Sequence, residues 1–240
     1  MKNTLIGISV CLIGMTGIAN AAVIDDFSLP AVGLTVNGPQ TGFAAGISSA
    51  GYARSLDITT SGTDTNVQIN TGTNPGRYAH SQSSGVFGTS TLTYTLPSID
   101  LTDGGTSNAL RLVLLSTDLN GILGVSINGI AQSLTTNAIL TGSVLVLPEY
   151  VDFLYSSFTG LVASNATTVS FTIDGSATAA LDASVANLGT ACSGLTGNGA
   201  TANASAGNCT PRIDVDAPAT LAMLGLGLAG LGMFRRRRAD

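Results

Sequence analysis

The sequence is poor in the side chains on which most catalytic and nucleic-acid-binding sites depend. Among its 240 residues tryptophan is absent, histidine occurs once, and aromatic residues account for 5%. The Gly-x-Ser-x-Gly elbow that carries the nucleophile of many serine hydrolases does not occur either. We therefore expect no enzymatic activity and no cofactor. One alternative stays open, because Glu149 and Asp152 could form the carboxylate pair of a secreted glycan-cleaving enzyme.

Basic residues are also scarce in the body of the chain. Residues 22–216 contain 13 acidic residues, four arginines and no lysine, a net charge of −9. A surface of this sign repels phosphate backbones and anionic lipid headgroups. We therefore expect no nucleic-acid partner, and no attachment to a membrane surface by charge.

The N-terminus has the pattern of a secretory signal. Lys2 provides the positive start, residues 5–18 are mainly apolar, and Ala19 and Ala21 place small side chains at the two positions that define a cleavage site. We expect residues 1–21 to form a signal helix that is removed after Ala21. A retained N-terminal anchor is the alternative.

A long uncharged segment lies close to the C-terminus. Residues 217–234 carry no charged side chain and are rich in glycine and leucine. As a helix they would span about 27 Å, enough to cross a thin hydrocarbon core. Guanidinium groups are costly to move through lipid, so basic residues that follow such a helix stay in the cytoplasm. We expect a transmembrane helix, with the body of the protein in the periplasm, because four arginines come next: Arg235, Arg236, Arg237 and Arg238.

The residues in front of this helix complete a recognisable layout. Pro218, Ala219 and Thr220 lead into the apolar span, while Asp216 and Ala217 stand where a Pro-Glu-Pro motif has its first two residues. Motif, apolar span and basic cluster over residues 216–240 together resemble the sorting tail of the PEP-CTERM family, the exosortase substrates of Gram-negative biofilm-forming bacteria. The resemblance implies processing within the motif by an exosortase-like membrane protease. A plain membrane anchor is the alternative.

The cysteines indicate a disulfide. Cys11 leaves with the signal, so Cys192 and Cys209 form one even pair in an exported protein. The residues between them are rich in Gly, Ala, Asn, Ser and Thr and have little else to order them. We expect residues 189–215 to form a disulfide-pinned loop and a stalk.

Residues 22–188 have the pattern of an all-β domain. Apolar side chains alternate with threonine and serine in residues 90–96 and 168–173, and Asn128 with Gly129 forms a strong hairpin signal. Residues 109–115 are typical of a central strand, and no long segment has a helical apolar stripe. We expect one antiparallel β-sandwich. Further strands are predicted at residues 23–29, 54–59 and 143–147.

Short pieces of this domain resemble jelly-roll carbohydrate-binding modules. They are the opening residues 23–27, the segment 54–58 after a glycine-rich loop, and a late strand around Asp182. Such modules often hold calcium between an N-terminal acid and a late strand, which makes Asp25, Asp26 and Asp182 candidate ligands of a structural calcium ion. Turn or cap roles are the alternative for Asp25 and Asp26.

A tyrosine can bind sugars because it offers a flat face and a hydroxyl. The best candidate ligand-binding group is Arg77, Tyr78 and His80, which we expect to lie in a loop. Ordinary packing is the alternative for each. The other tyrosines are Tyr52, Tyr94, Tyr150 and Tyr155, of which Tyr94 is expected in the core.

Together these features predict an exported structural or adhesive protein. It would be tethered to the inner membrane, then sorted to the cell surface or extracellular matrix in association with exopolysaccharide or biofilm. A module that binds an extracellular polysaccharide is the first alternative, and a secreted glycan-cleaving enzyme is the second.

Overall fold

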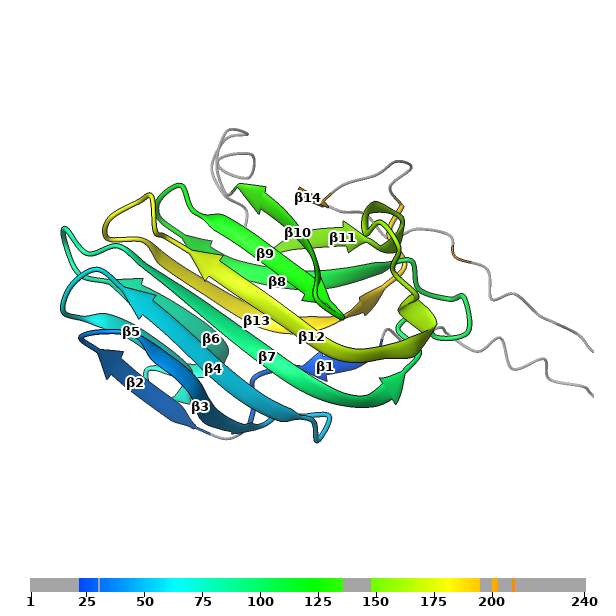
Figure 1. Ribbon diagram of the computed structural model, residues 1–240, viewed down its shortest axis with the longest axis horizontal. Helices are drawn as coiled ribbons and strands as arrows, with labels where there is room; N and C mark the ends of the chain where they lie inside the picture. Colours follow the sequence, from blue (N-terminus) through cyan, green and yellow to red (C-terminus); the bar gives the residue numbers. More distant parts are fainter. Residues whose placement is uncertain (1–21, 30, 136–147, 195–199, 203–208, 210–240) are drawn as a thin grey trace, which may run out of the picture.

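The computed structural model describes residues 22–29, 31–135, 148–194, 200–202 and 209. Two antiparallel β-sheets face each other and enclose one hydrophobic core, with strands running lengthwise along the molecule (Figure 1). The all-β, jelly-roll-like sandwich expected from the sequence is therefore confirmed. The predicted signal helix, the strand at 143–147 and the tail at 216–240 lie outside the described residues.

The first sheet, sheet A, has eight strands, and β1 (Val23–Asp25) pairs with its strand β13 outside the main path. Along that path the strands are β14 (Ala200–Ala202), β11 (Glu149–Leu154), β8 (Ala109–Thr117), β13 (Asp182–Ala191), β6 (Asn74–Gln82), β5 (Thr65–Thr71) and β2 (Val32–Val36).

The second sheet, sheet B, has six strands, and the chain crosses between the two sheets repeatedly. Two short 3₁₀ turns, η1 (Tyr155–Ser157) and η2 (Ala163–Asn165), lie between β11 and β12. In order the strands of sheet B are β10 (Ile130–Thr135), β9 (Ile122–Ile127), β12 (Ala166–Asp174), β7 (Gly88–Ile99), β4 (Ala53–Thr60) and β3 (Gln40–Ile47).

Period-two patterning explains how the sheets meet. In β7 the side chains of Leu92 and Tyr94 are fully buried, while the threonines between them point outward. In β12, Phe171 and Ile173 are buried in the same way, opposite Leu92 and Ser90. The inward rows of the two sheets therefore pack into a single core.

The predicted hairpin signal at Asn128 and Gly129 is confirmed. Both residues have positive φ, 51° and 80°, and connect β9 to β10. A two-residue turn with both φ values positive matches the right-handed twist of the strands. Asn128 has a second role, because its side-chain oxygen accepts a hydrogen bond from the Thr167 backbone N–H at 2.8 Å.

The N-terminal strand is tied to the end of β13. The Ala22 backbone N–H donates to the Thr190 hydroxyl at 2.8 Å, and the Thr190 N–H donates back to the Ala22 carbonyl at 2.8 Å. Two residues beyond β1, Phe27 is fully buried at φ 56° and packs against the rings of Tyr78 and Phe171. The first residues of the sandwich thus contribute directly to its core.

Three segments differ from the expectation. Residues 77–80 do not form a loop, because they lie within β6. β13 continues to Ala191, beyond the expected domain boundary at 188, and β14 forms a short strand inside the segment expected to be a loop. Segments of alanine, glycine and threonine form strands here because the neighbouring strands offer backbone partners. The apolar pattern of the sequence does not reveal this pairing.

No helix within the described parts of the chain combines the length and apolar character needed to span a bilayer. The predicted span 217–234 falls outside those parts.

Candidate functional site

The predicted ligand group at Arg77, Tyr78 and His80 is divided between the two faces of β6. Tyr78 and His80 point into the sandwich, with exposed fractions of 0% and 1%, whereas Arg77 points outward and is half-buried. Alternation along a strand separates neighbouring side chains in this way. The expected loop site is therefore not formed, and Tyr78 is a core residue whose ring packs edge-on against Phe171 at 4.8 Å.

His80 belongs to a buried polar network. The Gln82 amide donates to the Gly88 carbonyl at 2.6 Å and lies 2.8 Å from His80 Nε2, so Nε2 is the acceptor and Nδ1–H donates to the Ser90 hydroxyl at 2.7 Å. Burial lowers the pKa of His80 to about 4, against the opposing attraction of Asp182 and Asp174. A neutral histidine with both nitrogens engaged has a structural role.

The first calcium candidate, Asp25, already has strong partners. Its carboxylate is fully buried and accepts from Arg54 Nη1 at 2.7 Å and from the Tyr94 hydroxyl at 3.0 Å. Its other oxygen accepts from the backbone N–H of Phe27 at 2.9 Å and of Ser49 at 3.2 Å. Asp25 thus holds the N-terminal strand to the core through an ion pair and hydrogen bonds.

The three calcium candidates are not brought together. Asp26 caps the following turn, where hydrogen bonds from Ser28 lower its pKa. Asp25 lies opposite Leu188, six residues along β13 from Asp182, which places the two about 20 Å apart. Over the described ranges no cluster of three or more His, Cys, Asp or Glu side chains is suited to a metal ion.

The carboxylate pair considered for glycan cleavage is not assembled either. Glu149 and Asp152 are three positions apart on β11, so they point to opposite faces of sheet A. A glycosidase needs both carboxyl groups in one cleft, where they flank the scissile bond. Both oxygens of Asp152 are, in addition, bound by Arg111.

Arg111, Asp152 and Tyr150 form a connected group on the outer face of sheet A. Arg111 Nε and Nη2 donate to the two Asp152 oxygens at 2.6 and 2.7 Å. The guanidinium carbon lies 4.8 Å from the centroid of the Tyr150 ring, and that ring is 44% exposed. The hydrogen bonds that Arg111 donates to Asp152 raise the pKa of Arg111. We name these three residues the tyrosine platform.

Sequence reasoning found only part of this platform. The sequence offers Tyr150 as one of five candidate tyrosines and Asp152 as a candidate catalytic acid, and it assigns Arg111 no functional role. The available signal was an arginine in the middle of the apolar segment 109–115. A charged side chain at such a position requires a partner on the neighbouring strand.

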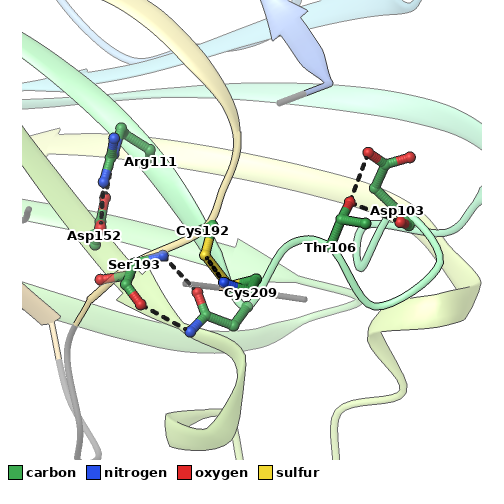
Figure 2. Close-up of a disulfide and its surroundings, with 8 residues drawn as sticks. Asp103, Thr106, Arg111, Asp152, Cys192, Ser193 and Cys209 are labelled. Atoms are coloured by element: carbon green, nitrogen blue, oxygen red, sulfur yellow. Dashed lines mark hydrogen bonds and ion pairs between the residues drawn. A yellow bond between two sulfur atoms is a disulfide. The ribbon is translucent and has the colours of Figure 1, made fainter. Parts of the chain in front are cut away.

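The predicted disulfide between Cys192 and Cys209 is confirmed, with a Cα–Cα distance of 5.6 Å. Figure 2 shows it together with the Arg111–Asp152 pair; Cys192 directly follows Ala191, which pairs with Ala109 of β8. Asn108 braces the same corner, since its side chain accepts from the Ser193 N–H at 2.7 Å and donates to the Ser193 carbonyl at 3.1 Å.

The disulfide-closed segment also adds a strand to the sheet. Between the two cysteines, β14 pairs with β11, with Ala202 opposite Val151 and Thr201 opposite Asp152. The strand that carries Tyr150 therefore has a backbone partner on each side. A covalent link between residues 192 and 209 keeps the outer strand at this edge.

The outer face of sheet B is covered by small hydroxyl side chains. Its rows are ordered by cross-strand contacts, for example Thr91 Oγ1 to Thr172 Oγ1 at 2.9 Å and Thr89 Oγ1 to Asp174 at 2.7 Å. A groove of about 420 Å³ runs where Gly124 leaves a gap between Thr172 and Ser133. We name this surface the hydroxyl face; its main residues are Ser55, Thr59, Thr89, Thr91, Thr93, Thr95, Ser126, Thr168, Ser170 and Thr172.

One family model matches the chain, and it covers the C-terminal tail. Residues 216–238 match the VPDSG-CTERM motif, a PEP-CTERM-like sorting signal. The matching pattern is thus the VPDSG form instead of the Pro-Glu-Pro form used for comparison above. This match is consistent with export and with membrane-anchored surface localisation. No curated protein matches the chain.

Among solved structures the chain is similar to family 11 carbohydrate-binding modules. One, from Clostridium thermocellum in complex with a β-1,3-1,4-mixed-linked tetrasaccharide, is 16% identical with a TM-score of 0.35, over 71% of this chain and 94% of that one. The module of the Clostridium thermocellum cellulase Lic26A-Cel5E is 14% identical with a TM-score of 0.32 over the same shares, and CtCBM11 is 16% identical with a TM-score of 0.37 over 73% and 97%. Sequence identities and TM-scores this low say nothing about what this chain binds.

Proposed function

We propose that this chain is an exported structural or adhesive protein of the cell surface or extracellular matrix, sorted by its C-terminal tail. The observation that carries the proposal is the match of residues 216–238 to the VPDSG-CTERM motif. The signal-like residues 1–21 and the disulfide agree with it, because structural disulfides persist in oxidising compartments.

The route begins with export and removal of residues 1–21 after Ala21. Residues 217–234 then hold the protein in the inner membrane, with Arg235–238 on the cytoplasmic side and the sandwich in the periplasm. An exosortase-like membrane protease next processes the chain within Ala217, Pro218, Ala219 and Thr220. The sandwich is finally transferred to the surface or the matrix, in association with exopolysaccharide.

The properties of the sandwich suit a structural role outside the cell. Its interior contains the Asp25–Arg54 ion pair, and one edge of sheet A is fixed by a disulfide. The candidate catalytic acids, Glu149 and Asp152, lie on opposite faces. A net charge of −9 over residues 22–216 keeps such a protein away from nucleic acid and anionic lipid.

The sorting step is tested by the mass and location of the protein in its native cells. A product that ends near residue 217, or carries an added group there, supports processing. A full-length chain in the membrane fraction would instead identify a plain anchor. Replacement of Arg235, Arg236, Arg237 and Arg238 by glutamine should abolish retention and processing, while the matched control Arg212→Gln should be sorted normally.

A second candidate function, binding of an extracellular polysaccharide, is favoured by one observation. Of the five tyrosines, Tyr150 alone is exposed, and it lies on a charged group that holds its ring in place. Exposed aromatic rings with a fixed orientation are typical contact points for sugars and other flat ligands.

A further inference from the structure

The tyrosine platform is built from two neighbouring strands and one buried anion. Arg111 of β8 pairs with Asp152 of β11 in the sheet register, and Tyr150 lies two residues earlier on the same outer face. The Asp152 side chain is fully buried and that of Arg111 is 19% exposed, whereas Tyr150 is 44% exposed. The Tyr150 ring is thus the most exposed part of the platform, and the Arg111–Asp152 pair beside it is held in place.

The orientation of the Tyr150 ring is set before any ligand arrives. Two charge-assisted hydrogen bonds in a bidentate arrangement leave the Arg111 guanidinium little freedom. Its plane then supports the Tyr150 ring through a cation–π contact at 4.8 Å. A ligand that stacks on this ring loses less side-chain entropy than it would on a free tyrosine.

The charge of the platform selects against strongly charged ligands. The positive charge of Arg111 is balanced by Asp152, so the pair is neutral as a unit. Residues 22–216 together carry a net charge of −9, which repels polyanions at a distance. Asp152 takes Nε and Nη2 of Arg111, so Nη1 has no hydrogen-bond partner among the described residues and can donate to a neutral oxygen.

The surroundings of the ring suit a small polar ligand better than a protein. The row across sheet A runs from Tyr150 to Val113 and on to Asn187, about 10 Å over three strands. Val113 and Asn187 are both half-buried, so beside the ring they present a small apolar surface and a side-chain amide. One exposed ring in such a row is far smaller than the apolar patch that a stable protein interface requires.

We propose that the tyrosine platform binds a pyranose ring of a neutral polysaccharide. The sugar would stack its C–H face on Tyr150, with a hydroxyl accepting from Arg111 Nη1 and another contacting the Asn187 amide. This inference rests on the second candidate function and assigns to it a site and a ligand class. It is independent of how the tail is processed.

The test compares two substitutions of Tyr150 in the purified full chain. Tyr150→Ala removes the stacking face, whereas Tyr150→Phe keeps the ring and loses only the hydroxyl. Phe87→Ala is the matched control, because Phe87 is an aromatic residue of similar exposure, 39%, in the connection between β6 and β7. Affinity electrophoresis through neutral β-glucan, xylan, mannan and galactan, with alginate as the anionic arm, gives the dissociation constants.

We expect the native chain to be retarded by at least one neutral polysaccharide and not by alginate. Tyr150→Ala should weaken that binding by about tenfold, equivalent to about 1.4 kcal/mol, Tyr150→Phe by no more than about threefold, and Phe87→Ala not at all. Unchanged melting temperatures establish that the variants fold. The inference is overturned if no neutral polysaccharide retards the native chain, if alginate alone does so, or if Tyr150→Ala binds as well as the native chain.

Discussion

Two Arg–Asp pairs in this protein use the same chemistry in opposite surroundings. Arg54 of β4 and Asp25 of β1 join sheet B to sheet A through the core, and both side chains are 0% exposed. Arg111 and Asp152 join neighbouring strands of one sheet, and Arg111 is 19% exposed. The pairs differ in what surrounds the guanidinium.

The buried pair is surrounded by further partners, and the surface pair leaves one side of its arginine available. Arg54 also donates to the Ala45 carbonyl at 2.9 Å, and Tyr94 donates to Asp25. In the core, therefore, nearly every polar atom of the pair serves to hold β1 in place, although Arg54 Nε has no hydrogen-bond partner. Arg111 instead presents its face to Tyr150. Burial makes the first pair a structural element, and partial exposure places the second beside the exposed Tyr150 ring, where we propose that a ligand binds.

Breaking the buried pair should have the largest effect. Asp25→Ala leaves the Arg54 charge buried without its partner, and we expect a loss of about 3–5 kcal/mol in the free energy of unfolding, measured by urea denaturation. The double variant Asp25→Leu with Arg54→Met should recover much of this loss, because neither charge then remains. Equal destabilisation by the single and double variants would contradict the assignment.

Acidification tests how much His80, a buried group that is neutral in the folded protein, contributes to stability. The pKa of His80 is 6.5 in the unfolded chain and about 4 in the folded one, so the unfolded state binds the proton first. The contribution of neutral His80 to the free energy of unfolding is fully present above pH 6.5. It should fall by about 3 kcal/mol as the pH decreases from 6.5 to 4. Urea denaturation at several pH values measures this slope. His80→Gln should flatten the slope over that range, and an unchanged slope would assign it to other groups.

Removal of the disulfide tests how the surface pair is supported. Cys192→Ser with Cys209→Ser should lower the free energy of unfolding by about 3 kcal/mol in the chain-entropy description. We also expect faster amide hydrogen exchange at Val151 and Phe153, whose strand pairs with β14, than at β7. Equal exchange rates in β11 and β7 of this variant would show that β14 does not depend on the crosslink.

Neutralising the Arg111–Asp152 pair should have the smallest effect on stability, because Arg111, the group that stays charged, is partly exposed. Asp152→Asn retains the shape but loses the carboxylate, and we expect a loss of about 1–2 kcal/mol in thermal unfolding, less than for Asp25→Ala. Polysaccharide affinity should fall as well, because Arg111 loses its fixed orientation under Tyr150. An effect on stability as large as that of Asp25→Ala would remove the distinction between the two pairs.

The strands with clear alternation were predictable, and those with polar inward residues were not. β7, β12 and the Asn128-Gly129 hairpin follow directly from their patterns. The sequence predicts a loop at residues 77–80 of β6, where the inward side chains His80 and Gln82 interrupt the apolar period. These two are stabilised by a network with Ser90 and Gly88, and no local pattern encodes such a network.

The disulfide was predictable from cysteine number and export alone, whereas the two ion pairs were not. Asp25 and Arg54 are 29 residues apart and lie on different sheets, and Arg111 and Asp152 are 41 apart. Their proximity depends on strand order, which the sequence leaves open. The calcium expectation was reasonable for the same acids, but it required Asp25 to lack the cationic partner that the fold provides.

The attachment of Ala22 to Thr190 has a practical consequence for recombinant work. Both backbone groups of Ala22 are engaged with β13, and the buried Asp25 follows three residues later. A purification tag or fluorescent reporter joined directly to this residue would lie beside β13 and the pairing that holds β1 in place. A flexible spacer ahead of Ala22 would keep the added domain away from this pairing.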